Sequence, residues 1–388
     1  APDFSGVLTS QGYNLFGNTA GTTITGFGTG NLVNVNALLD PILRDNGGST
    51  RTHALLPNSP AIDKGSPLSP ALLIDQRELT RPIDFPSIPN ALNGNGSDIG
   101  AFERQTVEIL RKTRFDYDGD GKADLSVFRP NTGSWYLSHS SNNAFIAVQF
   151  GANGDLIAPA DFDGDGKTDI CVFRPSDGGW YRLNSSNNTF TPAQFGTNGD
   201  LPVPGDFDGD GKADLTVYRP SAGSWYRINS SNNQFVAAQF GVAEDKPLVG
   251  DFDGDGKSDL TVFRPSNGTW YRINSATDTF SPAQFGAPGD LPAAADYDGD
   301  GKTDLAVYRP SVGDWYIINS SNGSFTGLHF GVTEDKPAPA DFDGDGKADL
   351  VVFRPSSGTW YLLRTTAGFT GFQFGASGDV PTPNAFVR

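Results

Sequence analysis

Six short segments of this chain concentrate aspartate at one fixed spacing, D-x-D-x-D-G-K-x-D, and each begins 45 residues after the last. The second segment runs from Asp161 to Asp169. Four carboxylates within nine residues repel one another unless a cation lies between them. Side-chain oxygens at positions 1, 3 and 5, a turn-forming Gly at position 6 and a backbone carbonyl at position 7 are the arrangement of a calcium loop. The segments therefore predict six calcium sites.

The predicted ligands are the four aspartates of each segment and the backbone carbonyl of its lysine. An EF-hand has Glu at position 12, whereas these loops have Asp at position 9 and are shorter. Acidic surface turns without metal are the alternative, but all 24 acidic positions of the six copies are Asp, which favours a metal. The predicted metal-binding residues are Asp116, Asp118, Asp120, Lys122, Asp124, Asp161, Asp163, Asp165, Lys167, Asp169, Asp206, Asp208, Asp210, Lys212, Asp214, Asp251, Asp253, Asp255, Lys257, Asp259, Asp296, Asp298, Asp300, Lys302, Asp304, Asp341, Asp343, Asp345, Lys347 and Asp349.

The composition limits the function classes. The formal net charge is −17 over 388 residues, and six Ca²⁺ would offset 12 of these charges. A chain this acidic lacks the basic surface that nucleic-acid binding requires, so we expect no nucleic-acid partner. No run of 18 apolar residues is present to form a transmembrane segment. The single cysteine, Cys171, rules out an intramolecular disulfide, and we expect it to be a buried, inert thiol.

Calcium also bears on where the protein works. Extracellular calcium modules bind with dissociation constants of roughly 10⁻⁴–10⁻³ M, far above cytosolic calcium. The chain contains no methionine and begins Ala1-Pro2-Asp3, which we interpret as a processed or trimmed fragment of a longer precursor. We therefore predict an extracellular or cell-surface protein.

Residues 106–388 repeat one order of motifs six times. In the unit that starts at Gly199, one short apolar segment precedes the aspartate loop and three follow it, at 215–220, 223–228 and 235–241. The alternation of period two in these segments is typical of strands. Four strands in 40–50 residues form one blade of a propeller, so the sequence predicts an all-β fold with six four-stranded blades.

The aspartate loop, with Phe-Gly and then Gly/Glu-Asp-x-Pro ahead of it, resembles the FG-GAP or VCBS repeat family, which is also found in integrin α-subunit propellers. The resemblance covers all six repeats. It implies a calcium-binding β-propeller with ligands at Asp116, Asp118, Asp120 and Asp124 and at their equivalents.

The number of blades rests on the end of the chain. Segment 380–386 looks like the start of a seventh unit, but Ala385 stands at the first ligand position. We interpret the segment as a closing strand that returns to the first blade, because closure removes sheet edges. Seven blades and an open array of blades are the alternatives.

Residues 1–105 lack the repeat and alternate short apolar runs with turn residues, which predicts short strands. The ordered segments 45–57, 59–63, 75–77 and 98–103 resemble the C-terminal end of choice-of-anchor Q surface proteins, which form a right-handed parallel β-helix. The resemblance implies the terminal rungs and cap of a β-helix, truncated on its N-terminal side. Asp63, Asp75 and Asp98 stand in turn-like contexts, so we interpret them as turn residues and not as catalytic acids.

Each repeat contains one Trp followed by Tyr. The alternatives for the tryptophans are packing between blades and a ring of aromatic contacts to glycans. These residues are Trp135, Trp180, Trp225, Trp270, Trp315 and Trp360.

Each repeat also contains Arg-Pro. We expect each arginine to pair with a carboxylate, either of the acidic loop or of the recurring Asp155, Asp200, Asp245, Asp290, Asp335 and Asp379. The arginines are Arg129, Arg174, Arg219, Arg264, Arg309 and Arg354. The three histidines, His53, His139 and His329, share no spacing and predict no zinc site or catalytic triad.

Three functions fit these observations. The first is a secreted, calcium-stabilised structural or adhesive protein of bacterial type, which is not an enzyme and self-associates into a filament or surface assembly through the solenoid end. The second is a lectin-like module that binds glycans through the Trp–Tyr pairs. The third is a polysaccharide lyase or hydrolase, which six nearly equal blades disfavour because catalysis usually needs an asymmetric site.

Overall fold

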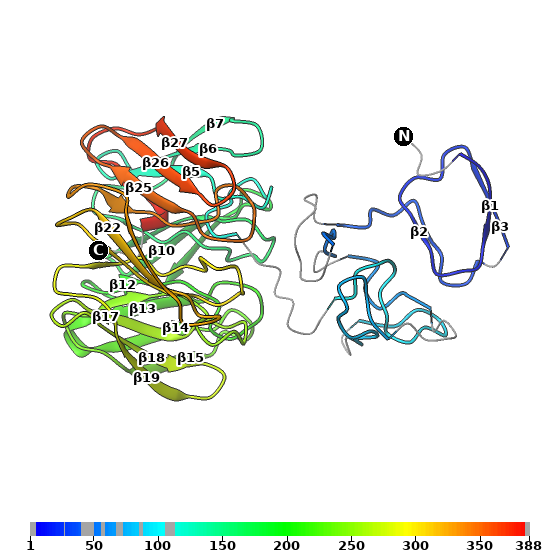
Figure 1. The fold of residues 1–388 in the computed structure, drawn as a ribbon, viewed down its shortest axis with the longest axis horizontal. Helices are drawn as coiled ribbons and strands as arrows, with labels where there is room; N and C mark the ends of the chain where they lie inside the picture. The colour runs from blue at the N-terminus through cyan, green and yellow to red at the C-terminus, as the bar shows by residue number, and fades with distance from the viewer. Residues whose placement is uncertain are drawn as a thin grey trace. The chain divides into compact units, whose positions relative to one another are not determined.

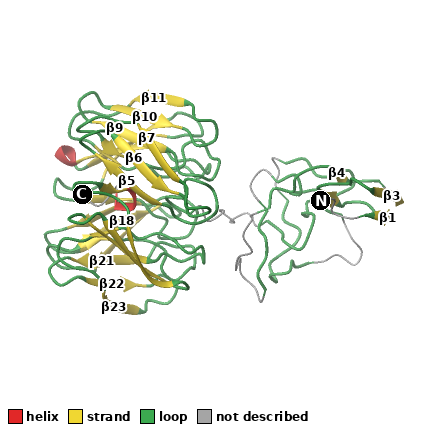
Figure 2. Cartoon of the chain, turned by 90° about the horizontal axis from the view of Figure 1, so that it is seen from above, coloured by secondary structure: helices red, strands yellow, loops and turns green. Residues whose placement is uncertain are grey.

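A computed structural model describes residues 5–26, 28–39, 50–55, 59–66, 73–84, 88–104 and 113–384. Segment 45–49 of the N-terminal motif, together with Ala385 and Phe386 of the expected closing segment, lies outside the described residues. The chain divides into two compact units, Ala1–Arg111 and Lys112–Arg388. Strands and loops make up nearly all of the described chain, and helix is confined to the 3₁₀ segments η1 (Pro220–Ala222) and η2 (Thr382–Asn384) (Figure 2). No helix among the described residues has the length and apolar character needed to cross a membrane.

The second unit is a propeller of six antiparallel four-stranded sheets. Each sheet starts with a short inner strand ahead of the aspartate loop, and three longer strands follow. The inner strands of blades two to six are β8 (Leu156–Ile157), β12 (Leu201–Pro202), β16 (Lys246–Leu248), β20 (Leu291–Pro292) and β24 (Lys336–Pro337). Figure 1 shows β27, in the last blade of the chain, beside β6 and β7 of the first.

Burial alternates with period two on outer strands, as the sequence predicts, whereas the second strands are buried at three or more successive positions. The second strands of the six blades are β5 (Leu125–Arg129), β9 (Ile170–Arg174), β13 (Leu215–Arg219), β17 (Leu260–Arg264), β21 (Leu305–Arg309) and β25 (Leu350–Arg354). The third strands are β6 (Ser134–Ser138), β10 (Gly179–Leu183), β14 (Ser224–Ile228), β18 (Thr269–Asn274), β22 (Asp314–Ile318) and β26 (Thr359–Arg364). The outer strands are β7 (Phe145–Gln149), β11 (Phe190–Gln194), β15 (Phe235–Gln239), β19 (Thr279–Gln284), β23 (Phe325–His329) and β27 (Gly368–Gln373).

The C-terminal segment closes the ring. Strand β28 (Val380–Pro381) pairs antiparallel with β5 and supplies the inner strand of the first blade. Val380 lies opposite Phe128, and Pro381 lies opposite Val127. The predicted closing strand and the six-blade propeller are therefore confirmed, and the seven-blade and open-array alternatives are not what the described residues form.

The tryptophans belong to the core of the blades. In the first blade, Trp135 is fully buried, its ring centroid lies 5.4 Å from that of Phe128, and its indole Nε1 donates a 2.8 Å hydrogen bond to the Phe150 carbonyl. All six tryptophans are 0–2% exposed. The packing interpretation is therefore correct. The glycan-contact role for the tryptophans is wrong, because their faces are covered by neighbouring core side chains.

The aromatic residue that each blade does expose is a phenylalanine on its outer strand. Phe235 is 56% exposed and stacks on Tyr226 with a centroid distance of 6.2 Å and an interplanar angle of 18°. Arg219 lies over the same tyrosine, with its guanidinium carbon 4.5 Å from the ring centroid. The equivalent exposed residues are Phe145, Phe190, Phe280, Phe325 and Phe369.

The recurring arginines pair with the recurring aspartates ahead of the inner strands. Arg219 Nε and one of its terminal nitrogens bind the two oxygens of Asp200 at 2.7 and 2.8 Å. The first blade has the same pair, in which Arg129 binds Asp379 of the C-terminal segment at 2.7 and 2.9 Å. The predicted pairing with the recurring aspartates is thus confirmed, and it is not the loop carboxylates that pair with these arginines. Cys171 is fully buried, and burial raises the pKa of its thiol far above the ordinary range, as expected for an inert thiol.

The first unit contains two parallel strand pairs. Strand β1 (Gly6–Ser10) pairs with β3 (Thr22–Gly26), and β2 (Leu15–Phe16) pairs with β4 (Leu32–Val33). Parallel pairing between segments so close in sequence fits successive turns of a solenoid, but the β-helix stays a prediction.

Asp63, Asp75 and Asp98 are buried, and Asp75 holds a turn, since its side chain accepts a hydrogen bond from the Arg77 backbone N–H at 2.7 Å. Asp75 accepts hydrogen bonds from the Arg77 side chain at 2.6 Å and from the Glu103 backbone N–H at 3.0 Å. Asp98 accepts hydrogen bonds from the backbone N–H groups of Asp63 and Arg104 at 2.9 and 2.6 Å. These bonds fix the backbone of the unit, which is a structural role.

Candidate metal centre

Each aspartate loop precedes the second strand of its blade, and in blades two to six it connects the inner strand to the second strand. In the first loop, Gly119 and Gly121 have φ values of 84° and 85°, in the left-handed region that favours glycine. These two residues turn the backbone N–H groups of the loop inward, toward the side chain of Asp116. The glycine spacing of the motif therefore serves the loop backbone directly.

The first and last aspartates hold the loop backbone together. In the second loop, Asp161 accepts hydrogen bonds from the N–H groups of Gly164 at 2.6 Å and Gly166 at 3.0 Å. Asp169 accepts one from the N–H of Phe162 at 2.8 Å. These contacts join the two ends of the loop, so its carboxylates face a common centre.

A pair of hydroxyl residues from the hairpin between the third and outer strands completes the site. Ser185 donates its N–H to Asp169 at 2.6 Å and its hydroxyl to Asp165 at 2.9 Å. Ser186 donates its hydroxyl to Asp163 at 2.6 Å. Sequence reasoning missed these residues, although their recurrence 24 and 25 residues after the first aspartate was a usable signal. The other hydroxyl pairs are Ser140 and Ser141, Ser230 and Ser231, Ser320 and Ser321, and Thr365 and Thr366, whereas the fourth blade has Ser275 followed by Ala276, which donates only its N–H.

The carboxylates come close enough to share a cation. In the second loop, one oxygen each of Asp161, Asp163 and Asp169 lies within 4.8 Å of the others. Burial is the largest cause that raises the pKa of Asp169 to about 6 and that of Asp116 in the first loop to about 7, with neighbouring aspartates adding to both shifts. These clustered, partly buried carboxylates resist ionisation because their negative charges would repel one another. A hard divalent cation such as Ca²⁺ binds to such oxygen ligands and removes that repulsion. The loop residues therefore fit the predicted metal.

The six loops also contact one another around the ring. The N–H of Thr168 in the second loop donates a 2.6 Å hydrogen bond to the carbonyl of Asp116 in the first. The Lys167 side chain lies against Gly119, where a β-carbon would come within 2.8 Å of Lys167 Cε. The same contacts join the last loop to the first, through Ala123 N–H on the Asp341 carbonyl at 2.7 Å and Lys122 against Gly344. Each lysine thus positions its neighbour's loop with its side chain, in addition to its predicted backbone role.

The histidines form no common site among the described residues. His139 Nδ1 lies 3.9 Å from Asp118 Oδ2 at the first loop. His329, on the outer strand of the fifth blade, has its Nδ1 2.8 Å from Asp314 Oδ1 on the third strand. Their separation agrees with the absence of a shared spacing in the sequence.

Family models locate these loops in a known repeat. The FG-GAP-like repeat model matches residues 116–172, 161–217, 251–307 and 296–352, and the FG-GAP repeat model matches residues 336–371. This chain belongs to the FG-GAP-like repeat family. Each longer match begins at the first aspartate of one loop and extends beyond the next loop, so the family unit contains the candidate metal residues.

Solved structures are similar to part of this chain at low identity. A lectin of Agrocybe aegerita, whose structure describes recognition of non-reducing terminal N-acetylglucosamine, is 15% identical with a TM-score of 0.44, over 69% of this chain and 91% of its own. The virginiamycin B lyase of Staphylococcus aureus is 10% identical with a TM-score of 0.42, over 68% of this chain and 85% of its own. Similarity at this level carries no argument about function. No curated protein matches the sequence.

Proposed function

We propose that this FG-GAP propeller binds about six calcium ions, one in each aspartate loop, and depends on them for its stability. The proposal rests on the convergence of three aspartate oxygens within 4.8 Å in each of the first five loops. The four aspartates of a loop and the carbonyl of its lysine would hold the ion, and the hairpin hydroxyl pair would orient two of the carboxylates. Bound calcium supplies positive charge that replaces carboxylate repulsion by coordination.

Calorimetric titration of the metal-free chain with CaCl₂ tests this proposal. We expect a stoichiometry near six ions per chain. The double substitution Asp206→Asn and Asp214→Asn removes two carboxylates from the third loop and should lower the stoichiometry by one. Asp177→Asn, in an exposed turn outside the loops, is the matched control and should leave it unchanged. A wild-type chain that takes up no calcium at millimolar concentration would refute the proposal.

We further propose that the protein acts outside the cell as a structural or adhesive component and is not an enzyme. Low-affinity calcium loops suit a calcium-rich environment. The two parallel strand pairs of the first unit have two strands each among the described residues, and such sheets present edges that can pair with another chain. Contact between this edge and a different surface of a neighbour would be heterologous and would build a filament.

Electron microscopy of the purified chain in millimolar calcium tests the assembly. Regular filaments would support a structural polymer. Dispersed particles of the size of one chain would count against self-association and favour an adhesive module. Assay of the chain on acidic polysaccharides tests the absence of enzymatic activity, and turnover would contradict it.

Glycan binding is the second candidate function, and the exposed phenylalanines favour it. Six exposed phenylalanines, five of them stacked on a tyrosine, are repeated around the outer strands, where sugar rings can reach them. Glycan-array binding that is lost in Phe235→Ala, with the melting temperature nearly unchanged, would support this role. Binding that survives removal of several of these phenylalanines would exclude it.

A further inference from the structure

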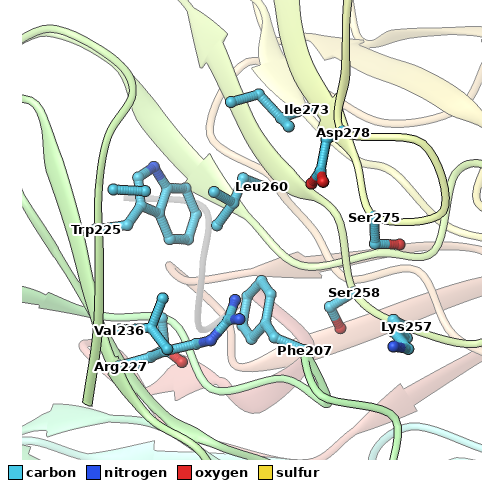
Figure 3. A pocket seen from close by; sticks show the side chains of 12 residues that line it. Phe207, Trp225, Arg227, Val236, Lys257, Ser258, Leu260, Ile273, Ser275 and Asp278 are labelled. Atoms are coloured by element: carbon cyan, nitrogen blue, oxygen red, sulfur yellow. The ribbon is translucent and has the colours of Figure 1, made fainter. Parts of the chain in front are cut away.

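The third and fourth blades enclose a pocket with a volume of about 530 Å³. Strands β13 to β15 and the third loop provide one wall, and strands β17 and β18 with the fourth loop provide the other. Figure 3 shows the guanidinium of Arg227 beside the ring of Phe207, and Leu260 with Ser258 and Ser275 farther across the pocket. The volume lies in the range of small-molecule sites, roughly 300–1,000 Å³.

Two polar side chains of this pocket, Thr216 and Arg227, lie side by side on neighbouring strands. Thr216 is fully buried, and its hydroxyl has no hydrogen-bond partner. Arg227 lies directly opposite Thr216 in the register of β13 and β14. Its Nε donates a 2.8 Å hydrogen bond to Asn229, and its guanidinium carbon lies 5.4 Å from the centroid of Phe207. A buried hydroxyl without a partner beside a half-buried cation is costly unless a further group satisfies both.

The propeller does not need a cation at this position. The residue equivalent to Arg227 is Leu137 in the first blade, Ile317 in the fifth and Leu362 in the sixth, and all three are buried. The residue equivalent to Thr216 in the fifth blade is Ala306, which lies opposite Ile317. Aliphatic pairs therefore fill the same space in the fifth and sixth blades, whereas the third and fourth blades have the polar pairs Thr216–Arg227 and Thr261–Arg272.

We propose that this pocket binds a small organic carboxylate with an apolar body. An arginine guanidinium pairs with a carboxylate through two parallel hydrogen bonds, and the Thr216 hydroxyl is a further donor. Val236, Leu260 and Ile273, which are partly exposed, offer apolar surface for the rest of the ligand. Lys257 adds a second positive charge on the opposite wall, whereas the carboxylate of Asp278 lies exposed at the rim. The site is separate from the proposed calcium function and does not rest on it.

Calorimetric titration of the full chain, in millimolar calcium, with 1-naphthylacetate and with its neutral amide 1-naphthylacetamide tests the proposal. The two probes have the same ring and differ in charge at one end. We expect the acid to bind saturably and the amide to bind at least about tenfold more weakly, since the charge-assisted pair is lost. Absence of saturable binding of the acid, or equal binding of the two probes, would overturn the proposal.

Substitutions that copy other blades locate the site. Arg227→Ile introduces the side chain of the fifth blade and should reduce affinity for the acid at least about tenfold, while the melting temperature stays near that of the wild type. Thr216→Ala should cause a smaller loss. Arg182→Ile removes the equivalent cation of the second blade and should leave the affinity unchanged. Binding that survives Arg227→Ile, as direct coordination of the probe to a loop metal would, contradicts the assignment.

Discussion

Buried carboxylates occur in both units of the chain, but their partners differ. In the first unit, Asp75 pairs with Arg77 at 2.6 Å, and both side chains are buried. In the propeller, the buried Asp124 of the first loop accepts hydrogen bonds from the backbone N–H groups of Tyr117 and Ser140 at 2.8 and 2.7 Å. Asp75 thus has its compensating cation in the sequence of the first unit, whereas we propose that an ion from solution fills that role for the propeller loops. The stability of the propeller should therefore respond to calcium in the medium.

Calcium removal should produce the largest effect and would test this contrast directly. Binding to the folded state alone stabilises by about 2.7 kcal/mol per site when the ligand is at 100 times its dissociation constant. With six sites, we expect a chelator to lower the melting temperature of the propeller by tens of degrees, as measured by calorimetry. The transition of the first unit should not move. An unchanged propeller transition, or equal shifts in both units, would contradict the claim that calcium stabilises the propeller and not the first unit.

The pH dependence of the metal-free propeller should be the next largest effect. Burial raises the pKa of Asp116 to about 7 and that of Asp206 and Asp341 to about 6, above the value of about 3.9 in an unfolded chain. The folded state therefore binds more protons than the unfolded state between these values. Its stability should rise as the pH falls from about 7 to about 4.

Calcium should reverse that trend, because coordination requires deprotonated carboxylates. Melting curves at pH 5 and pH 8, recorded with and without calcium, measure both cases. The metal-free propeller should melt at the higher temperature at pH 5, and the calcium-loaded propeller at pH 8. The same sign in both series would show that the loop carboxylates do not control the transition.

Arg77→Ala should damage the first unit and spare the propeller. Arg77 donates to Asp75 and to the Glu103 carbonyl, both at 2.6 Å, and lies 3.7 Å over the ring of Phe102. Loss of one partner from a buried ion pair typically costs about 3–5 kcal/mol. Chemical unfolding of the wild type, of this variant and of the exposed control Arg51→Ala would measure the loss. A comparable loss in the control would mean that charge alone matters.

Phe235→Ala should give the smallest change. The side chain is 56% exposed and contributes one stacked contact to Tyr226, worth about 1 kcal/mol. Trp225→Ala in the same blade removes a buried indole and should cost about 3–5 kcal/mol. Denaturant midpoints of the two variants rank them. A loss for Phe235→Ala as large as that for Trp225→Ala would place the phenylalanine in the core.

The repeats made most of the propeller predictable. Five equal intervals between six aspartate loops predicted six blades, and the tail that includes Val380 predicted the closing strand. The face of each strand that packs was harder to predict. Alternation places Trp225 and Tyr226 on opposite faces, but it does not say which face is covered, and the exposed aromatic residue proved to be Phe235 on the next strand.

The remaining features depend on contacts between blades, which no repeat spacing encodes. The Lys167 side chain lies on the loop of the preceding blade, and Arg227 lines a pocket against the following blade. Single-repeat reasoning treats both as solvent-facing cations. Comparison of the six copies gives a signal only for Arg227, because aliphatic residues replace it in three blades and nothing replaces the lysine.

The closing strand also determines the order in which the blades can be completed during synthesis. The first blade receives its inner strand, and the Asp379 partner of Arg129, from residues made 250 positions later. Blades two to six each contain their own four strands and can form as they leave the ribosome, whereas the first blade must wait as three strands with an open inner edge. A polypeptide interrupted before Val380 would keep that edge exposed. Only a chain that includes the closing strand therefore hides this edge, and incomplete chains would be prone to proteolysis and aggregation.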